Sequence, residues 1–135
     1  MYKLLMLLIG ITFLSCKSDE KTKPVTALDT GRAFIRASLD GDFKTAGSFL
    51  LKDDENAQEF TAYEQYYNRM PEVHKKEYKE SSYEINKYTD INDSTTIINY
   101  SNSYMKKPME IKVVRNAGVW VIDFKYTFSG NLPIN

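Results

Sequence analysis

The chain has 135 residues, and its 18 acidic and 18 basic side chains give a formal net charge of zero at pH 7. This balance argues against a nucleic-acid partner, because proteins that bind phosphate backbones carry an excess of clustered Lys and Arg. One cysteine cannot form an internal disulfide or supply the several thiolates of a zinc site. We therefore expect folding by hydrophobic packing, with no metal and no cofactor.

The first 15 residues have the order of a secretory signal peptide. Lys3 supplies a positive charge, and an almost unbroken apolar run extends from Leu4 to Leu14. This run is shorter than the roughly 20 apolar residues that cross a bilayer core, and a charged segment follows it at Lys17. We predict that residues 1–15 are cleaved off and do not form a permanent membrane span.

The junction Phe13-Leu14-Ser15-Cys16 resembles a lipobox, since a small residue precedes the only cysteine where the apolar run ends. The resemblance implies that Cys16 becomes the acylated N-terminus of a bacterial lipoprotein. Each buried methylene adds about 0.8 kcal/mol of membrane affinity, so several acyl chains hold firmly. Cys16 is thus the predicted lipidation site, and the membrane is the predicted partner. The alternatives are ordinary secretion with an unpaired thiol, or a buried core cysteine.

Residues 17 to 24 are polar, mixed in charge and end in Pro24, a composition typical of a flexible tether. Acidic residues just after an acylated cysteine resemble the export signals of some Gram-negative surface lipoproteins. A solvated spacer explains the same composition equally well. We predict that residues 16–24 are the acylated cysteine and tether, and that the protein is lipid-anchored at the bacterial outer membrane, either periplasmic or surface-exposed.

Residues 25–135 have the length of a single domain, and their first half has helical periodicity. Thr26 can cap a helix with Asp29 in its first turn, and apolar residues recur at helical spacing up to Leu39. The Asp40-Gly41 pair is a stop signal. The sequence therefore predicts a first amphipathic helix from Thr26 to Leu39.

Further helices are predicted up to residue 80. Asp42 can cap a short helix through Leu50, which the charged segment 52–55 closes. A longer helical stripe from Ala57 to Met70 ends at a proline, and that proline suits the first turn of one more helical piece.

The second half is rich in β-branched and aromatic residues, which favours strands. Strands are predicted at residues 83–88, 95–105, 109–115 and 119–128, with turns at 90–94, 106–108 and 116–118. Consecutive strands with short turns are antiparallel. The order predicts an α+β fold in which N-terminal helices pack on a curved four-stranded antiparallel sheet.

Alternation in the last predicted strand places Trp120, Ile122, Phe124 and Tyr126 on one face, and Asp123 on the opposite face. We expect the aromatic face to point inward, with Trp120 filling the concave core and Asp123 pointing away from it.

The opening segment 31–43 and the closing segment 113–122 resemble bacterial lipoproteins of unknown function with a nuclear transport factor 2-like, or cystatin-like, fold. The resemblance covers Val25 to Phe128 and implies the fold, not an activity. Enzymes of that wider superfamily place aspartate, histidine or tyrosine inside a cone between helices and sheet. This chain departs from that pattern, because its only histidine, His74, lies in a charged run typical of a solvated helix face.

No catalytic constellation is evident from the sequence. A nucleophile needs a base within hydrogen-bond reach, and His74 has no such neighbour in the sequence. The acidic segments 53–55 and 90–93 lack the spacing and glycine of a calcium loop, so a helix end and a turn explain them better.

Ten tyrosines are the unusual feature of the composition, and most fall in elements that should border a cavity. Tyrosine suits half-wet pockets and interfaces, although finishing the core is the simpler explanation. The predicted pocket or core residues are Phe34, Tyr63, Tyr67, Trp120, Phe124 and Tyr126. We favour a noncatalytic binding or interaction domain for an unknown small ligand or envelope protein. The alternative is a small lyase, isomerase or hydrolase using tyrosine and carboxylate groups in a cone-shaped pocket.

Overall fold

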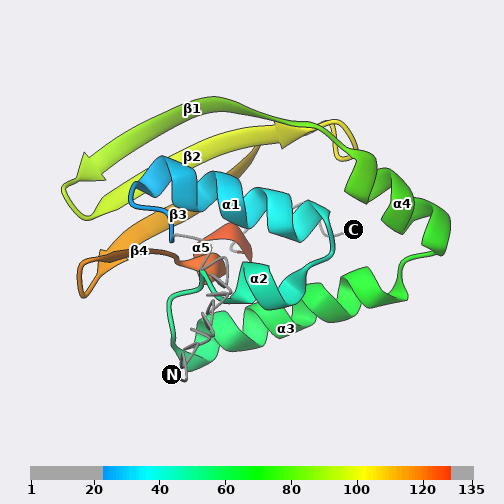
Figure 1. Cartoon of the computed structure of the whole chain (residues 1–135), viewed down its shortest axis with the longest axis horizontal. Helices are drawn as coiled ribbons and strands as arrows, with labels where there is room; N and C mark the ends of the chain where they lie inside the picture. The colour runs from blue at the N-terminus through cyan, green and yellow to red at the C-terminus, as the bar shows by residue number, and fades with distance from the viewer. Residues whose placement is uncertain (1–22, 129–135) are drawn as a thin grey trace, which may run out of the picture.

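The sheet is a simple antiparallel meander in the order β1-β2-β3-β4 (Figure 1). The computed structural model describes residues 23–128. Within them the helices are α1 (Ala27–Leu39), α2 (Phe43–Gly47), α3 (Asp54–Arg69), α4 (Glu72–Glu80) and α5 (Phe124–Phe128). The strands are β1 (Tyr83–Asn92), β2 (Thr95–Asn102), β3 (Met109–Asn116) and β4 (Val119–Ile122). The predicted signal peptide and Cys16 lie outside the described residues.

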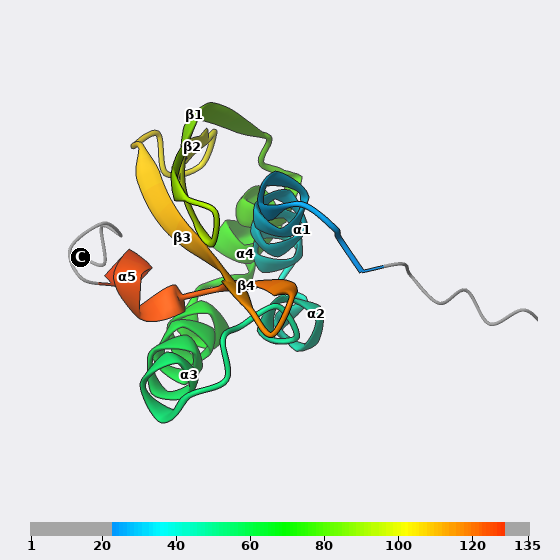
Figure 2. The same cartoon turned by 90° about the vertical axis from the view of Figure 1, so that its left-hand side faces the viewer.

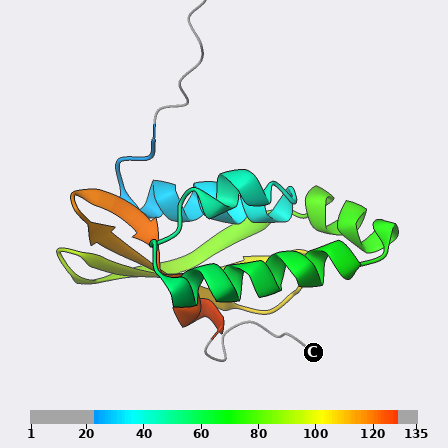
Figure 3. The same ribbon diagram turned by 90° about the horizontal axis from the view of Figure 1, so that it is seen from below.

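The predicted fold class is confirmed: helices precede a four-stranded antiparallel sheet and pack on it. α1 lies on β2, β3 and β4 (Figure 1), whereas α3 packs on α5 and runs from there toward α4 (Figure 3). β2 and β3 alternate buried and half-buried residues, which places Ile98, Tyr100, Ile111 and Val113 in the interior. None of the helices among residues 23–128 is long and apolar enough to span a bilayer.

Side-chain caps set where the first helices begin. Thr26 Oγ1 accepts a hydrogen bond from the Asp29 amide at 3.1 Å, and Asp42 accepts one from the Thr45 amide at 3.0 Å, as predicted. Segment 52–55 was predicted to close the second helix, which was wrong, because α2 ends at Gly47 and the segment lies at the N-terminal end of α3. Asp53 accepts from the Asn56 amide at 2.7 Å and opens α3, because carboxylates at a helix N-terminus satisfy free amides and complement the dipole.

The last predicted strand was wrong beyond Ile122. After β4 the backbone turns at Asp123 into α5, and the Lys125 amide donates a hydrogen bond to Asn56 Oδ1 at 2.8 Å. Asp123, between β4 and α5, is 7% exposed because Asn56, Lys112 and Lys125 contact its carboxylate. β2 also ends earlier than predicted, because Asn102 Oδ1 accepts hydrogen bonds from the next two free amides and forms a turn. β1 instead continues to Asn92.

An aromatic cluster fills the interior between the helices and the sheet. Phe124 lies with its ring centroid 5.8 Å from Phe34, 5.3 Å from Phe60 and 5.7 Å from Tyr63. Phe43 extends the cluster toward α2, with its ring 5.7 Å from Phe60. Edge-on and tilted rings at these distances pack densely. Aliphatic side chains from α1 and the sheet complete the core around this aromatic cluster.

Candidate functional site

The structure separates the six predicted pocket residues into four locations. Phe34, Tyr63 and Phe124 border a small interior cavity. Tyr67 lies at the edge of the aromatic cluster, 5.0 Å from the Phe43 ring. Trp120 lies at the far end of the sheet, and Tyr126 donates a hydrogen bond to Glu110 Oε1 at 3.2 Å outside the cavity. The predicted residues therefore do not form one pocket.

The interior cavity is too small for an organic ligand. Its volume is about 20 Å³, room for a single water molecule, whereas ligand pockets hold some hundreds of cubic ångströms. The walls are rings and aliphatic side chains, with the hydroxyls of Ser38 and Thr127 also buried there. The cone predicted from sequence is thus a filled core.

The tyrosines of this cavity are held in their neutral form. The Tyr63 and Tyr78 hydroxyls are 2.6 Å apart. Burial, reinforced by the Tyr78 hydroxyl, raises the pKa of Tyr63 well above its ordinary range, and burial likewise raises the pKa of Tyr100. The cavity lining includes neither a carboxylate nor an imidazole. A phenol of raised pKa is a poor acid at neutral pH, so this arrangement lacks the matched groups that general acid–base catalysis needs.

His74 lies on the surface in contact with Tyr104. Its Nδ1 is 3.2 Å from the Tyr104 hydroxyl and 3.6 Å from Glu77 Oε2. Both contacts use the same ring nitrogen, whereas a histidine relay holds one partner on each nitrogen. These three side chains therefore do not form a proton relay between a tyrosine and a carboxylate.

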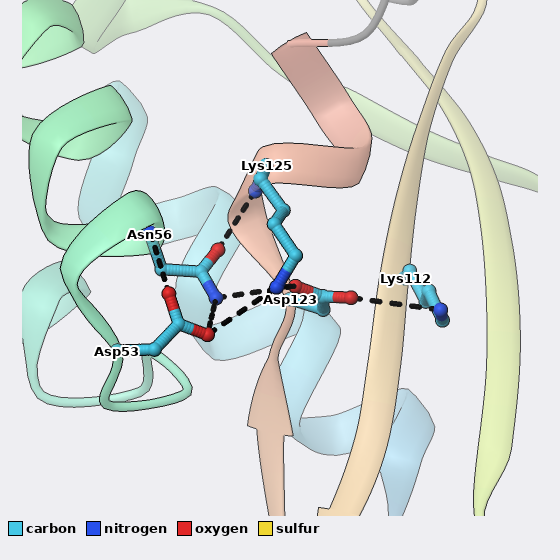
Figure 4. A network of polar contacts seen from close by, with 5 residues as sticks. All are labelled: Asp53, Asn56, Lys112, Asp123 and Lys125. Atoms are coloured by element: carbon cyan, nitrogen blue, oxygen red, sulfur yellow. Dashed lines mark hydrogen bonds and ion pairs between the residues drawn. The ribbon is translucent and has the colours of Figure 1, made fainter.

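A polar cluster joins the N-terminal end of α3 to β3 and α5 (Figure 4). Asp123 Oδ1 accepts from Asn56 Nδ2 at 3.1 Å and pairs with Lys125 Nζ at 3.1 Å, while its Oδ2 lies 3.5 Å from Lys112 Nζ. Lys125 also reaches Asp53 at 3.3 Å. Because every carboxylate here has a cationic or amide partner, we interpret the cluster as a clamp that positions α5.

The same clamp shifts two pKa values. A hydrogen bond from the Asn56 amide lowers the pKa of Asp53 below its ordinary 3.8. The hydrogen bond to Asp123 raises the pKa of Lys125 above its ordinary 10.5. Both shifts favour the charged forms, as expected for a structural ion-pair network.

An open groove of about 630 Å³ lies where the sheet extends beyond α1. α1 has 13 residues and spans about 20 Å, whereas the 10 residues of β1 span about 33 Å. The Arg36 guanidinium donates hydrogen bonds to the Lys79 and Ser81 carbonyls at 2.9 and 3.0 Å. These bonds align the end of α1 with the start of β1. The surplus strand length therefore projects past the start of α1, as Figure 1 shows.

Aromatic, aliphatic and acidic side chains line this groove. One wall is the start of α1, and the other is the inner face of the β1–β2 hairpin with Trp120. Tyr88 is 53% exposed. Asp90 accepts a hydrogen bond from Thr96 Oγ1 at 2.7 Å, and the Arg115 guanidinium lies 5.8 Å from the Trp120 ring centroid. Aromatic faces beside carboxylates suit a ligand with an apolar body and a positive charge. The full lining is Val25, Thr26, Ala27, Leu28, Tyr88, Asp90, Asn92, Asp93, Thr96 and Trp120.

Of these lining residues, sequence reasoning identified only Trp120 as a pocket residue, and it placed that residue in the core. Asp90 and Asp93 were interpreted as turn residues, and Asp93 does follow the end of β1. The length difference between the first helix and the first strand was the one available signal, but the predicted strand stopped at Tyr88.

Comparison of the chain with family models, curated proteins and solved structures found no match. The structure itself establishes an α+β fold, with N-terminal helices packed against a four-stranded antiparallel sheet.

Proposed function

We propose that the mature protein is an outer-membrane lipoprotein, anchored through Cys16, whose domain is a noncatalytic binding module with its ligand site in the groove. One observation carries this proposal: the interior is filled by aromatic and aliphatic side chains, whereas the groove beside Trp120 is open and about 630 Å³ in volume. Within the proposal the fold is a nuclear transport factor 2-like, or cystatin-like, roll, which the order of helices before a meander supports.

The position of the tether is compatible with this arrangement. The described chain begins at Lys23, and Val25 and Thr26 already line the groove. Lys23 follows Cys16 by seven positions, which is at most about 25 Å along a fully extended chain. An anchor at Cys16 would therefore keep the groove near the membrane.

The groove favours a small amine with an apolar body, or a peptide segment of that chemistry. Tyr88 and Trp120 offer ring surface, and Asp90 and Asp93 offer negative charge. A cation over an aromatic ring is worth roughly 0.5–1 kcal/mol at exposed sites, so we expect weak binding of minimal probes. The lyase, isomerase or hydrolase alternative lacks support, because the lining of the interior cavity includes no carboxylate.

Acylation is tested first, on the protein produced in a lipoprotein-processing bacterium. We expect an intact mass that includes acyl chains, and partition into the detergent phase, for the native chain. Cys16→Ala should lose both properties. An unmodified native chain that stays in the aqueous phase would refute the anchor.

Ligand binding is tested with two matched probes, phenethylamine and 2-phenylethanol, which share a ring and differ in charge. Trp120 is the only tryptophan, so its fluorescence reports directly on the groove. We expect a saturable change with the amine, at least threefold weaker binding of the alcohol, and loss of this preference in Asp93→Asn. Asp54→Asn, which changes an exposed carboxylate on α3, is the control and should bind as the native protein does. Equal binding of both probes would contradict the proposed chemistry.

A further inference from the structure

Four large apolar side chains are exposed around the groove end of the domain. Val25 is 83% exposed, Ile91 60%, Tyr88 53% and Val119 47%. Single exposed apolar residues are ordinary on protein surfaces, but a group of them beside a half-buried tryptophan marks a contact surface. We call these four residues, together with Trp120, the sheet-end surface.

The sheet-end surface is assembled from three segments that are distant in sequence. Val25 precedes α1, Tyr88 and Ile91 lie near the end of β1, and Val119 begins β4. The Arg115 amide donates a hydrogen bond to the Ser94 carbonyl at 2.8 Å, which joins the two hairpins. Figure 2 looks onto this end and shows the β1–β2 hairpin, the β3–β4 hairpin and the start of α1 together.

The charged groups of this end balance as a whole, although two carboxylates lie in the groove itself. Asp90 and Asp93 are accompanied by Lys87 and Arg115, so acidic and basic groups balance. Asn92, Asp93 and Asn116 are exposed at this end as well, beside the aliphatic and aromatic side chains of the sheet-end surface. Tyrosine and tryptophan are the side chains that favour the headgroup level of a bilayer, and aliphatic tips can enter its acyl boundary.

We propose that the sheet-end surface rests on the lipid bilayer to which the protein is tethered. This inference depends on the proposed acyl anchor, because a tether that enters the domain at Lys23 holds this end close to the membrane. The α4 end, at the opposite side of the domain (Figure 1), then faces away from the bilayer. In this orientation the groove lies at the membrane surface, so its ligand would bind there.

A matched pair of tryptophan probes tests this orientation. Ile91 and Val73 are equally exposed, at 60% and 59%, and Val73 lies on α4 at the other end of the domain. The variants are Ile91→Trp and Val73→Trp, each combined with Trp120→Phe. Both are made as full-length acylated chains and reconstituted in phosphatidylcholine vesicles with brominated acyl chains, which quench nearby indoles.

We expect fluorescence at position 91 to be quenched at least twofold relative to unbrominated vesicles, with emission shifted to shorter wavelength. Position 73 should emit as in water and lose less than a tenth of its intensity. The native protein provides a second reading that needs no substitution, because Trp120 itself should be quenched more than position 73.

Flotation of the vesicles separates failure of the orientation from failure of the anchor. Protein that floats with the vesicles but shows equal quenching at positions 91 and 73, or more at 73, overturns the orientation and leaves the anchor intact. Protein that lacks acyl mass and does not float overturns the proposed function, and the orientation with it.

Discussion

The aromatic interior and the groove end are made of similar residue types, yet they differ in how completely they are covered. Phe124, at 1% exposure, is surrounded by rings from α1 and α3. Tyr88, on the inner face of the sheet, is 53% exposed. The difference arises because α1 is shorter than β1, so the sheet loses its cover at one end. Element length, more than residue type, decides which aromatic residues are core and which are available to a ligand.

The largest expected effect comes from the interior. Phe124→Ala should lower the free energy of unfolding by about 3–5 kcal/mol, because it removes a ring that contacts Phe34, Phe60 and Tyr63 in a filled core. Urea denaturation measures the loss. Val119→Ala, at a 47% exposed position, is the control and should change stability by less than about 0.5 kcal/mol. Similar losses in both variants would contradict the distinction between the two regions.

Two glycines with left-handed backbone differ in the same way, since one is packed against the aromatic cluster and the other lies at the open end of the sheet. Gly41 has φ +71°, and a Cβ there would overlap the Tyr67 hydroxyl, whereas Gly118 has φ +78° and open space around it. Gly118→Ala should cost about 1 kcal/mol, the price of a left-handed alanine. Gly41→Ala should cost about 2–3 kcal/mol, because Tyr67 must also move. Equal midpoints in denaturant for the two variants would show that the Tyr67 side chain moves aside without a measurable loss of stability.

The parts of the fold that sequence predicted are those with local causes. Thr26 and Asp42 cap the helices predicted for them, because capping depends only on a side chain and amides within three residues. The antiparallel meander followed from short turns between strand-forming segments.

Long-range partners explain what the sequence did not predict. Lys125 turns into α5 because its amide meets Asn56, 69 positions earlier, and Asp123 is buried because Asn56 and two lysines reach it. No local pattern contains those contacts. The candidate groove was missed for the same kind of reason, since it depends on how far β1 projects past α1 once Arg36 has fixed their alignment.

Acidification tests the clamp that holds α5 over the interior. The folded-state pKa of Asp53 lies below its ordinary 3.8, so its ionised form stabilises the native state above that pH, and the contribution is lost as pH falls through the folded value. Asp53→Asn keeps a side chain able to cap α3 but cannot titrate. We expect the native protein to lose stability more steeply than this variant between about pH 4 and pH 2, measured by thermal unfolding. Parallel curves would refute a role for Asp53 ionisation.

The smallest effect on stability is expected at the groove, where the effect on binding should be largest. Tyr88→Ala should change the free energy of unfolding by less than about 0.5 kcal/mol, because the ring is more than half exposed and outside the aromatic cluster. The same substitution should weaken phenethylamine binding severalfold, since it removes one of the two aromatic side chains in the lining. Tyr66→Ala, at a 38% exposed position on α3, is the matched control and should leave binding unchanged. If Tyr88→Ala instead destabilised the protein by several kcal/mol, Tyr88 would belong to the core. If phenethylamine binding were also unchanged, the groove would not be the ligand site.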